Sequence, residues 1–220
     1  QVINHADDPT VLQNEENEFY ELAKYLMAKY QGTGKTFILK NWEGDWIGLF
    51  NYDATVDLTA ARADAMVKWF SARQRGINRA RAEYFLVRGV AVLGAVEVNQ
   101  VMDYVKLGLK RVIDQVVPRV GADLVTYSAY DSCTGRQGTD KATTEASLTQ
   151  ALSAIDQLAP DPLGLGKKRI VISEFGFYEN EYTSDPTMPV WRAEAILEAS
   201  KNFGIFGAFF CQLYDNECYD

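Results

Sequence analysis

The chain has 220 residues, of which 47% are hydrophobic, 24% charged and 12% aromatic, and its formal net charge is −8. This length fits one domain with a sizeable core. The acidic balance, without any basic cluster, excludes nucleic acid as an expected partner, and the lack of a run of about 18 apolar residues excludes a membrane span.

Apolar residues recur every three or four positions over 15–30, which predicts a helix, and they do so again over 58–81. Short apolar runs bounded by polar residues predict strands. In chain order, the expected elements are a helix over 15–30, a strand over 36–40, a helix over 58–81, a strand over 90–98, a helix over 101–116 closed by Pro118, a strand over 123–127, a helix over 144–158, a strand from Arg169 into Ser173, a helix over 190–203 and a strand over 205–213.

These five strands alternate with helices and no two of them form an adjacent hairpin, which predicts βαβ units and a parallel sheet. No strand is followed by the Gly-rich turn of a dinucleotide-binding sheet. Instead, each strand ends in polar and aromatic residues, as in a (β/α)8 TIM barrel. A whole barrel takes about 250 residues. We therefore expect residues 1–220 to form a single α/β barrel domain that is incomplete at both ends, with its first strands before residue 1 and its last helix after residue 220.

Both ends of the chain look cut from a longer protein, because residues 1–9 resemble the tail of a strand running into a loop and 215–220 directly follow a strand. The missing signal peptide therefore does not argue for the cytoplasm. We expect a secreted or extracellular protein.

Two stretches have the same form, an apolar strand that ends at a glutamate. Ile170-Val171-Ile172 leads into Ser173 and Glu174, and the strand over 36–40 leads into Glu43, which lies between Trp42 and Trp46. Chemistry in parallel barrels lies at the carboxyl ends of the strands. We therefore interpret Glu43 and Glu174 as a pair of catalytic carboxylates.

Other strand-end side chains are candidates for binding substrate. Glu97 and Asn99 are two apart on one strand and so face the same way. They either bind sugar hydroxyls or form a buried polar pair that holds the barrel together. The full set of candidate substrate-binding residues is Asn41, Trp46, Glu97, Asn99, Tyr127 and Gln212.

We expect neither a metal nor another cofactor. Cys133, Cys211 and Cys218 lack CxxC or Cys/His spacing, and His5 is the only histidine. The cysteines are either free thiols or one disulfide with one thiol left over.

The order of these strand-end motifs resembles that of the clan A glycoside hydrolases. The motifs are Trp42-Glu43, then Tyr127, then Ser173-Glu174-Phe175-Gly176, and last Phe210-Cys211-Gln212-Leu213-Tyr214. The resemblance implies a retaining (β/α)8 enzyme whose strands four to eight lie in this chain. It implies a carbohydrate substrate, with Glu43 as the acid/base at the end of strand four and Glu174 as the nucleophile at the end of strand seven.

Retaining hydrolysis needs two carboxyl groups about 5–5.5 Å apart, one protonated and one ionised. The two tryptophans beside Glu43 form an apolar wall that we expect to raise its pKa. A hydrogen bond from the Tyr127 phenol to Glu174 would favour the ionised nucleophile.

Two rival hypotheses remain. Trp42 stands where the clan usually has Asn, and Cys211 stands where it often has Trp, which favours a carbohydrate-binding barrel without catalysis. An unrelated barrel enzyme, such as an isomerase or aldolase, would want a lysine in the cleft or a metal cluster. Lys40 is the only strand-end lysine, and its side chain should point opposite to Leu39 and Asn41, so we rank this hypothesis last.

Overall fold

The computed structural model describes residues 2–49, 52–134, 138–177 and 185–211. They form an α/β fold around a five-stranded sheet. The strands are β1 (Lys35–Leu39), β2 (Val90–Val98), β3 (Leu124–Ser128), β4 (Ile170–Phe175) and β5 (Gly207–Phe210). The helices are α1 (Pro9–Lys29), α2 (Gly44–Gly48), α3 (Ala60–Glu83), α4 (Val101–Leu107), α5 (Val112–Gln115), α6 (Val117–Val120), α7 (Tyr130–Cys133), α8 (Lys141–Leu158) and α9 (Met188–Phe203), with 3-10 turns at Val2–His5 and Gly166–Arg169.

The strand order in the sheet is the order in the chain, β1-β2-β3-β4-β5, and each neighbouring pair is parallel. Every crossover therefore moves to the next position in the same direction. A doubly wound sheet would instead reverse its order at a switch point. The expected alternation of strands and helices is confirmed, and the sheet is a curled half-barrel.

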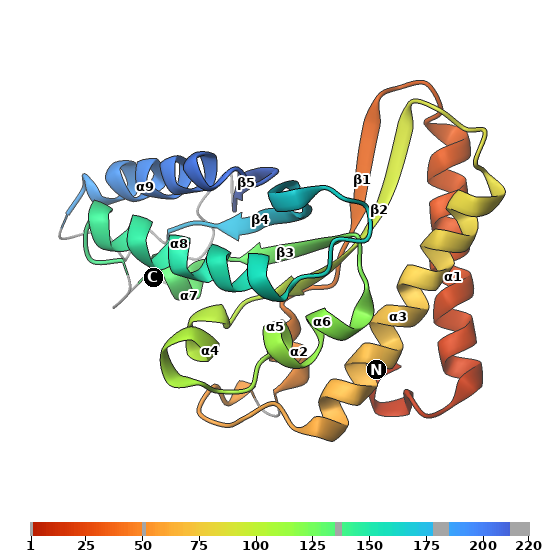
Figure 1. The fold of residues 1–220 in the computed structure, drawn as a ribbon, viewed down its shortest axis with the longest axis horizontal. Coiled ribbons are helices and arrows are strands. Elements are labelled where there is room, and N and C mark those ends of the chain that lie inside the picture. Colours follow the sequence, from red (N-terminus) through yellow and green to blue (C-terminus); the bar gives the residue numbers. More distant parts are fainter. Residues whose placement is uncertain (1, 50–51, 135–137, 178–184, 212–220) are drawn as a thin grey trace, which may run out of the picture.

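The curl is concentrated in β2. Its first half, Val90 to Gly94, pairs with β1, and its second half, from Ala95, pairs with β3. Figure 1 shows β1 and β2 standing steeply beside α1, whereas β3 and β4 run nearly across the molecule. Gly94 lies at the change of partner, and a Cβ on it would come within 2.2 Å of Gln74 Oε1 on α3. The absence of a side chain at Gly94 therefore lets α3 approach the bend.

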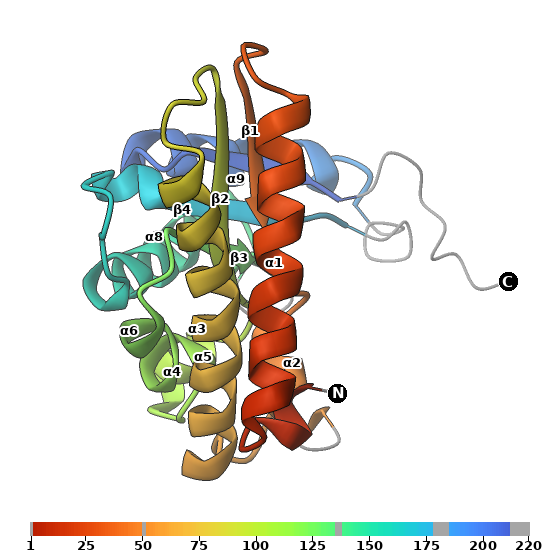
Figure 2. The same cartoon turned by 90° about the vertical axis from the view of Figure 1, so that its right-hand side faces the viewer.

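Helices cover the convex face of the sheet. Figure 2 shows α1 and α3 side by side over β1 and β2, where Phe19, Ile77 and Val92 form one apolar cluster. The remaining convex residues, such as Val125 and Ile172, pack into the main core. The concave face carries a smaller cluster of Ala95, Leu124 and Val171, with Ile38, Leu93 and Leu165 packed against it.

The helix predicted over 101–116 is wrong. The segment folds as α4 and α5, with α6 directly after it, because Gly108 takes the left-handed conformation (φ 68°) and ends α4. Pro118 lies in the first turn of α6, where its missing N–H costs no intrahelical bond. The short α2, which directly follows Glu43, was not predicted.

No helix among the described residues is long and apolar enough to cross a membrane.

Candidate active site

A cluster of charged and hydroxyl side chains lies on the concave face, where β1 to β4 end. Period-two alternation puts Thr126 and Ser128 on this face and Tyr127 on the convex face. The members of the cluster are Lys40, Glu43, Glu97, Thr126, Ser128, Ser173 and Glu174.

Glu97 is the centre of the cluster and has no exposed surface. Its Oε2 lies 2.6 Å from Lys40 Nζ and accepts hydrogen bonds from the hydroxyls of Ser173 and, at 3.4 Å, Thr126. Its Oε1 accepts the backbone N–H of Glu43 at 2.9 Å. Both oxygens are therefore occupied by protein donors, as a buried carboxylate requires.

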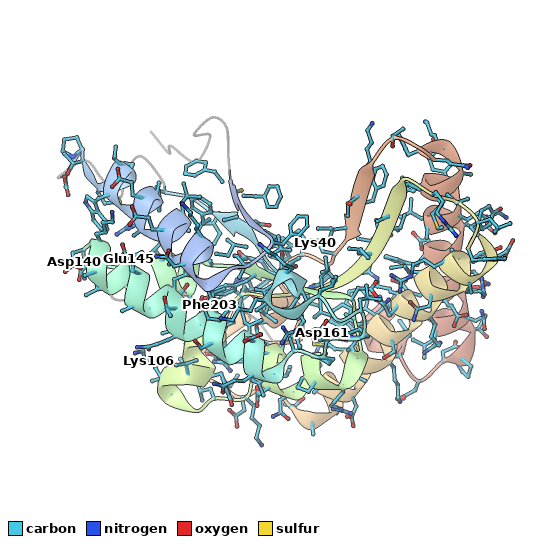
Figure 3. The ribbon with its side chains drawn as sticks, turned by 45° about the horizontal axis from the view of Figure 1, so that its top comes forward. Lys40, Lys106, Asp140, Glu145, Asp161 and Phe203 are labelled. Atoms are coloured by element: carbon cyan, nitrogen blue, oxygen red, sulfur yellow. The ribbon has the colours of Figure 1, made fainter. Side chains whose placement is uncertain are left out.

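Lys40 also contacts the expected nucleophile, because its Nζ lies 3.3 Å from Glu174 Oε1. The expected alternation holds, since Leu39 packs in the cluster under α1 and α3. Lys40, however, lies on the concave side that holds the carboxylates. Figure 3 shows it near the middle of the molecule, between β1 and β4.

A β-bulge in β4 brings two consecutive side chains to the same face. Tyr127 pairs with Ile172, but its neighbour Ser128 pairs with Glu174, so β4 carries one extra residue. The same shift recurs against β5, between Ile172 and Phe175. Regular alternation would turn Ser173 and Glu174 to opposite faces, and the extra residue lets both reach the cluster.

Glu43 lies at the start of α2 in a strained backbone conformation, with φ 21°. Its Oε1 accepts a hydrogen bond from Ser128 Oγ at 2.8 Å, and Ser128 is the register partner of Glu174. Neighbouring strands lie about 4.8 Å apart, so Glu43 and Glu174 lie at the same end of the sheet, on either side of Ser128.

The pKa of Glu43 is raised above its ordinary value, first because of burial. The Ser128 hydrogen bond lowers it, the negative charges of Glu174 and Glu97 raise it, and Lys40 lowers it. The direction agrees with the expectation for an acid, since each carboxylate nearby disfavours a further negative charge.

Asn41 and Asn99 hold the backbone of the site. The Asn41 amide accepts the Glu97 N–H at 2.9 Å and donates to the Glu97 carbonyl at 3.3 Å, as a neighbouring strand would. Asn99 Oδ1 accepts the Asp45 N–H, and Asp45 Oδ2 accepts the Asn99 N–H. Asn99 Nδ2 is buried and has no hydrogen-bond partner among the described residues.

Three predicted residues lie elsewhere. The Tyr127 side chain is buried on the convex face, where its hydroxyl donates to Asp131 and not to Glu174; burial raises its pKa well above the ordinary value. Trp46 lies on α2 and packs against the main core, with its ring edge-on to Tyr52 at 6.2 Å. Gln212 lies outside the described residues.

The two positions that depart from the clan also have defined surroundings. Trp42 is 53% exposed. Cys211 donates its N–H to the Phe175 carbonyl at 2.8 Å, and a Cβ on Gly176 would come within 1.9 Å of the Cys211 carbonyl oxygen. Gly176 therefore permits close contact between the ends of β4 and β5.

Sequence reasoning missed Lys40, Thr126, Ser128 and Ser173 as members of the site. Thr126 and Ser128 had a usable signal, because two hydroxyl residues at period two in an apolar strand indicate a polar face. Ser173 had no such signal, because it reaches the cluster only through the β-bulge in β4, and that bulge depends on pairing with the neighbouring strands.

Chemically, the cluster holds three carboxyl groups and one ammonium group within a partly covered site. Among the described residues, no group of three or more His, Cys, Asp or Glu side chains is placed to hold a metal ion. The arrangement supplies one carboxyl group with a raised pKa, two further carboxyl groups and a cation at one mouth of the sheet. No protein-family model matches the chain, and no curated protein matches it.

Proposed function

We propose that the chain carries strands four to eight of a (β/α)8 barrel and acts as a retaining β-glycosidase on a poly- or oligosaccharide. The observation that carries this proposal is that Glu43, whose pKa is raised, accepts a hydrogen bond from Ser128, the register partner of Glu174, so that both glutamates lie at the same end of the sheet. Two carboxyl groups in different environments are what double displacement requires.

In the first step, Glu174 attacks the anomeric carbon and the glycosidic bond breaks, while Glu43 gives its proton to the leaving oxygen. A covalent glycosyl ester on Glu174 results. In the second step, Glu43 removes a proton from water, the water oxygen attacks the anomeric carbon and Glu174 leaves as a carboxylate. The second step thereby restores the proton on Glu43 and the free carboxylate of Glu174 for the next cycle.

The backbone of Glu43 supports a functional role. A strained backbone conformation, such as a non-glycine residue at positive φ, costs about 1–3 kcal/mol, and such conformations cluster at functional sites. Here the conformation is fixed by the hydrogen bond from Glu43 N–H to Glu97 Oε1. That bond directs Glu43 toward the strand that bears Ser128.

Barrel closure is the structural part of the proposal. β1 and β5 each have one neighbour among the described residues, and the concave face between them is partly open. It holds a hollow of about 410 Å³ lined by residues that include Leu93, Leu124 and Phe206. Further strands that join the two edges would fill this hollow.

The test uses the full-length protein and a panel of aryl β-glycosides and β-linked glycans. Replacing Glu174 by Gln should lower kcat by about 10⁴-fold or more, because the nucleophile is lost. Glu43→Ala should lose activity on substrates with poor leaving groups, which need a proton from the acid. On a substrate with a good leaving group, added azide should restore turnover of this variant, because azide attacks the glycosyl-enzyme without a general base. Turnover that survives in the Glu174→Gln variant would refute the assignment.

A second candidate, a carbohydrate-binding barrel without catalysis, is favoured by Trp42, an exposed aromatic ring next to Glu43. Such a ring can stack on a sugar face without chemistry. Calorimetric binding of a glycan by the wild type, with no hydrolysis of any glycan in the panel, would favour this candidate over the enzyme.

A further inference from the structure

Lys40 lies between two carboxylates of different burial. Its Nζ is 2.6 Å from Glu97 Oε2 and 3.3 Å from Glu174 Oε1. The Glu97 side chain has no exposed surface, whereas those of Glu174 and Lys40 are 21% and 30% exposed. The ammonium group therefore joins a buried carboxylate to one that faces the opening.

The charges of the cluster can be counted. Lys40 and Glu97 form a close pair with no net charge, and removal of either partner would leave a buried charge uncompensated. With Glu43 protonated, the remaining charge of the cluster is the single negative charge of Glu174. An oxocarbenium-like transition state develops positive charge at the anomeric carbon, so a single negative charge there stabilises it.

We propose that Lys40 and Glu97 form a charge-compensated positioning pair, which holds Glu174 as an oriented carboxylate in front of the sugar. The inference rests on the proposed function. Lys40 does not touch the reacting atoms. It acts through Glu174, and Glu97 keeps the lysine from neutralising the nucleophile.

The surroundings of Glu174 make Lys40 the main candidate for this role. Glu43 follows β1, Glu97 lies on β2, and both are acidic. β3 contributes the uncharged Ser128, and the Tyr130 hydroxyl of α7 lies beside Gly176. Among the described residues, Lys40 is the cation in contact with Glu174.

The experiment compares Lys40→Met, Lys40→Arg and the double variant Lys40→Met with Glu97→Gln in the full-length protein. Lys40→Met should lower kcat/KM by about 10- to 100-fold, because a misplaced reacting group costs up to about 10²-fold. The acidic limb of its pH profile should move to higher pH, since a positive charge near Glu174 is lost. Lys40→Arg should keep the acidic limb of the pH profile at its wild-type position, because arginine preserves the positive charge.

The double variant separates positioning from folding. It has no unpaired buried charge, so its midpoint of urea unfolding should return toward that of the wild type. Its acidic limb should move back only part of the way toward that of the wild type, because the negative charge of Glu97 is gone but the ammonium group in contact with Glu174 is still missing. If the double variant recovers both the unfolding midpoint and the limb, or if Lys40→Met keeps the wild-type limb, Lys40 serves only to compensate Glu97 and the proposal is wrong.

A measurement without turnover keeps this test independent of the glycosidase assignment. Carbodiimide with glycine ethyl ester modifies carboxyl groups more readily as they gain protons, and mass spectrometry locates the modification. Modification of Glu174 should begin at higher pH in Lys40→Met than in the wild type. Should the wild type hydrolyse no glycan, the proposed function fails, while an unshifted modification profile would overturn the positioning role alone.

Discussion

The Ser128 hydroxyl is a small group with a direct electrostatic effect on Glu43. It donates to Glu43 Oε1 at 2.8 Å and thereby lowers the pKa of that carboxyl against the opposing effect of burial. A hydrogen bond to the charged form of an acid always acts in this direction. Ser128 therefore helps to set the pH above which the acid is no longer protonated.

Replacing Ser128 by Ala should raise the pKa of Glu43 further, because the burial that disfavours the carboxylate remains. The basic limb of the kcat/KM profile should move to higher pH, since this limb reports loss of the proton from the acid. The measurement is a pH–rate profile on an aryl glycoside. Ser153→Ala, which removes a hydroxyl bonded to the Thr149 carbonyl within α8, should leave the profile unchanged. An unmoved basic limb in Ser128→Ala would mean that Glu43 is not the titrating acid.

The sequence predicts the two glutamates of the site better than it predicts their neighbours. Glu43 and Glu174 each follow an apolar run, which is a local pattern. The side of the sheet that Lys40 faces depends on which face α1 and α3 cover, and this is a property of the packed fold. Tyr127 shows the same dependence, since one position along β3 decides between the core and the site.

At the scale of elements, α2 is anchored by one buried carboxylate. Asp45 is 1% exposed, and its oxygens accept the backbone N–H groups of Asn99, Gln100 and Val112 at 2.8–3.1 Å. Burial raises the pKa of Asp45, while these three bonds lower it. The anchor ties the turn after Glu43 to the end of β2 and the start of α5.

Asp45→Ala should lower the free energy of unfolding by about 3 kcal/mol or more, because each unsatisfied buried N–H costs about 1–3 kcal/mol. Activity should fall as well, since Glu43 is two residues away. Urea unfolding measures the first effect. Asp57→Ala is the matched control, as its exposed carboxylate accepts a single N–H, from Lys110, and should cost about 1 kcal/mol or less. Equal losses in the two variants would contradict the anchoring role.

The predicted strands are recovered because each is a short apolar run bounded by polar residues or glycine. The helix from Val101 fails because its periodicity continues past Gly108, where the backbone turns left-handed. Arg111 then fixes the following turn, since its buried guanidinium bonds Asp103 and the carbonyls of Ala54 and Val56. Such long-range bonds leave no trace in local periodicity.

For the whole molecule, one partly buried acid, Asp131, links stability to pH. Asp131 lies partly buried at the start of α7, where burial raises its pKa to about 8, while hydrogen bonds from Tyr127 and Met102 N–H lower it. The unfolded chain releases this proton near pH 4. The folded protein therefore binds one more proton than the unfolded chain between about pH 4 and pH 8, and its stability falls as pH rises through that window.

Asp131→Asn should remove this dependence, because an amide keeps the shape of the protonated acid and does not titrate. Relative to the variant, the wild type should lose up to about 1.4 kcal/mol per pH unit across the window. Urea unfolding of both proteins at pH 5 and pH 8 gives the difference. Parallel stability curves for the two proteins would show that Asp131 is ionised in the folded state.

The alternating order of elements indicated a parallel sheet, and the structure adds the curl. Curvature depends on the exchange of partners along β2 at Gly94. A lone glycine in an apolar run does not reveal which helix approaches it. The sequence therefore predicts the fold class, a parallel α/β sheet, but not its curvature, which depends on the packing of α3 against the bend.

Because of the extra residue in β4, the residues that pack the sheet differ from those that contribute side chains to the polar cluster. Ile172 and Phe175 both pack into the main core, and a single residue between them would suffice to keep that spacing regular. A gene that lost one codon at 173 or 174 would still encode an intact strand, but with one group in place of a hydroxyl and a carboxylate. If the proposed glycosidase function holds, a protein with the same architecture and no catalysis is thus a single deletion away.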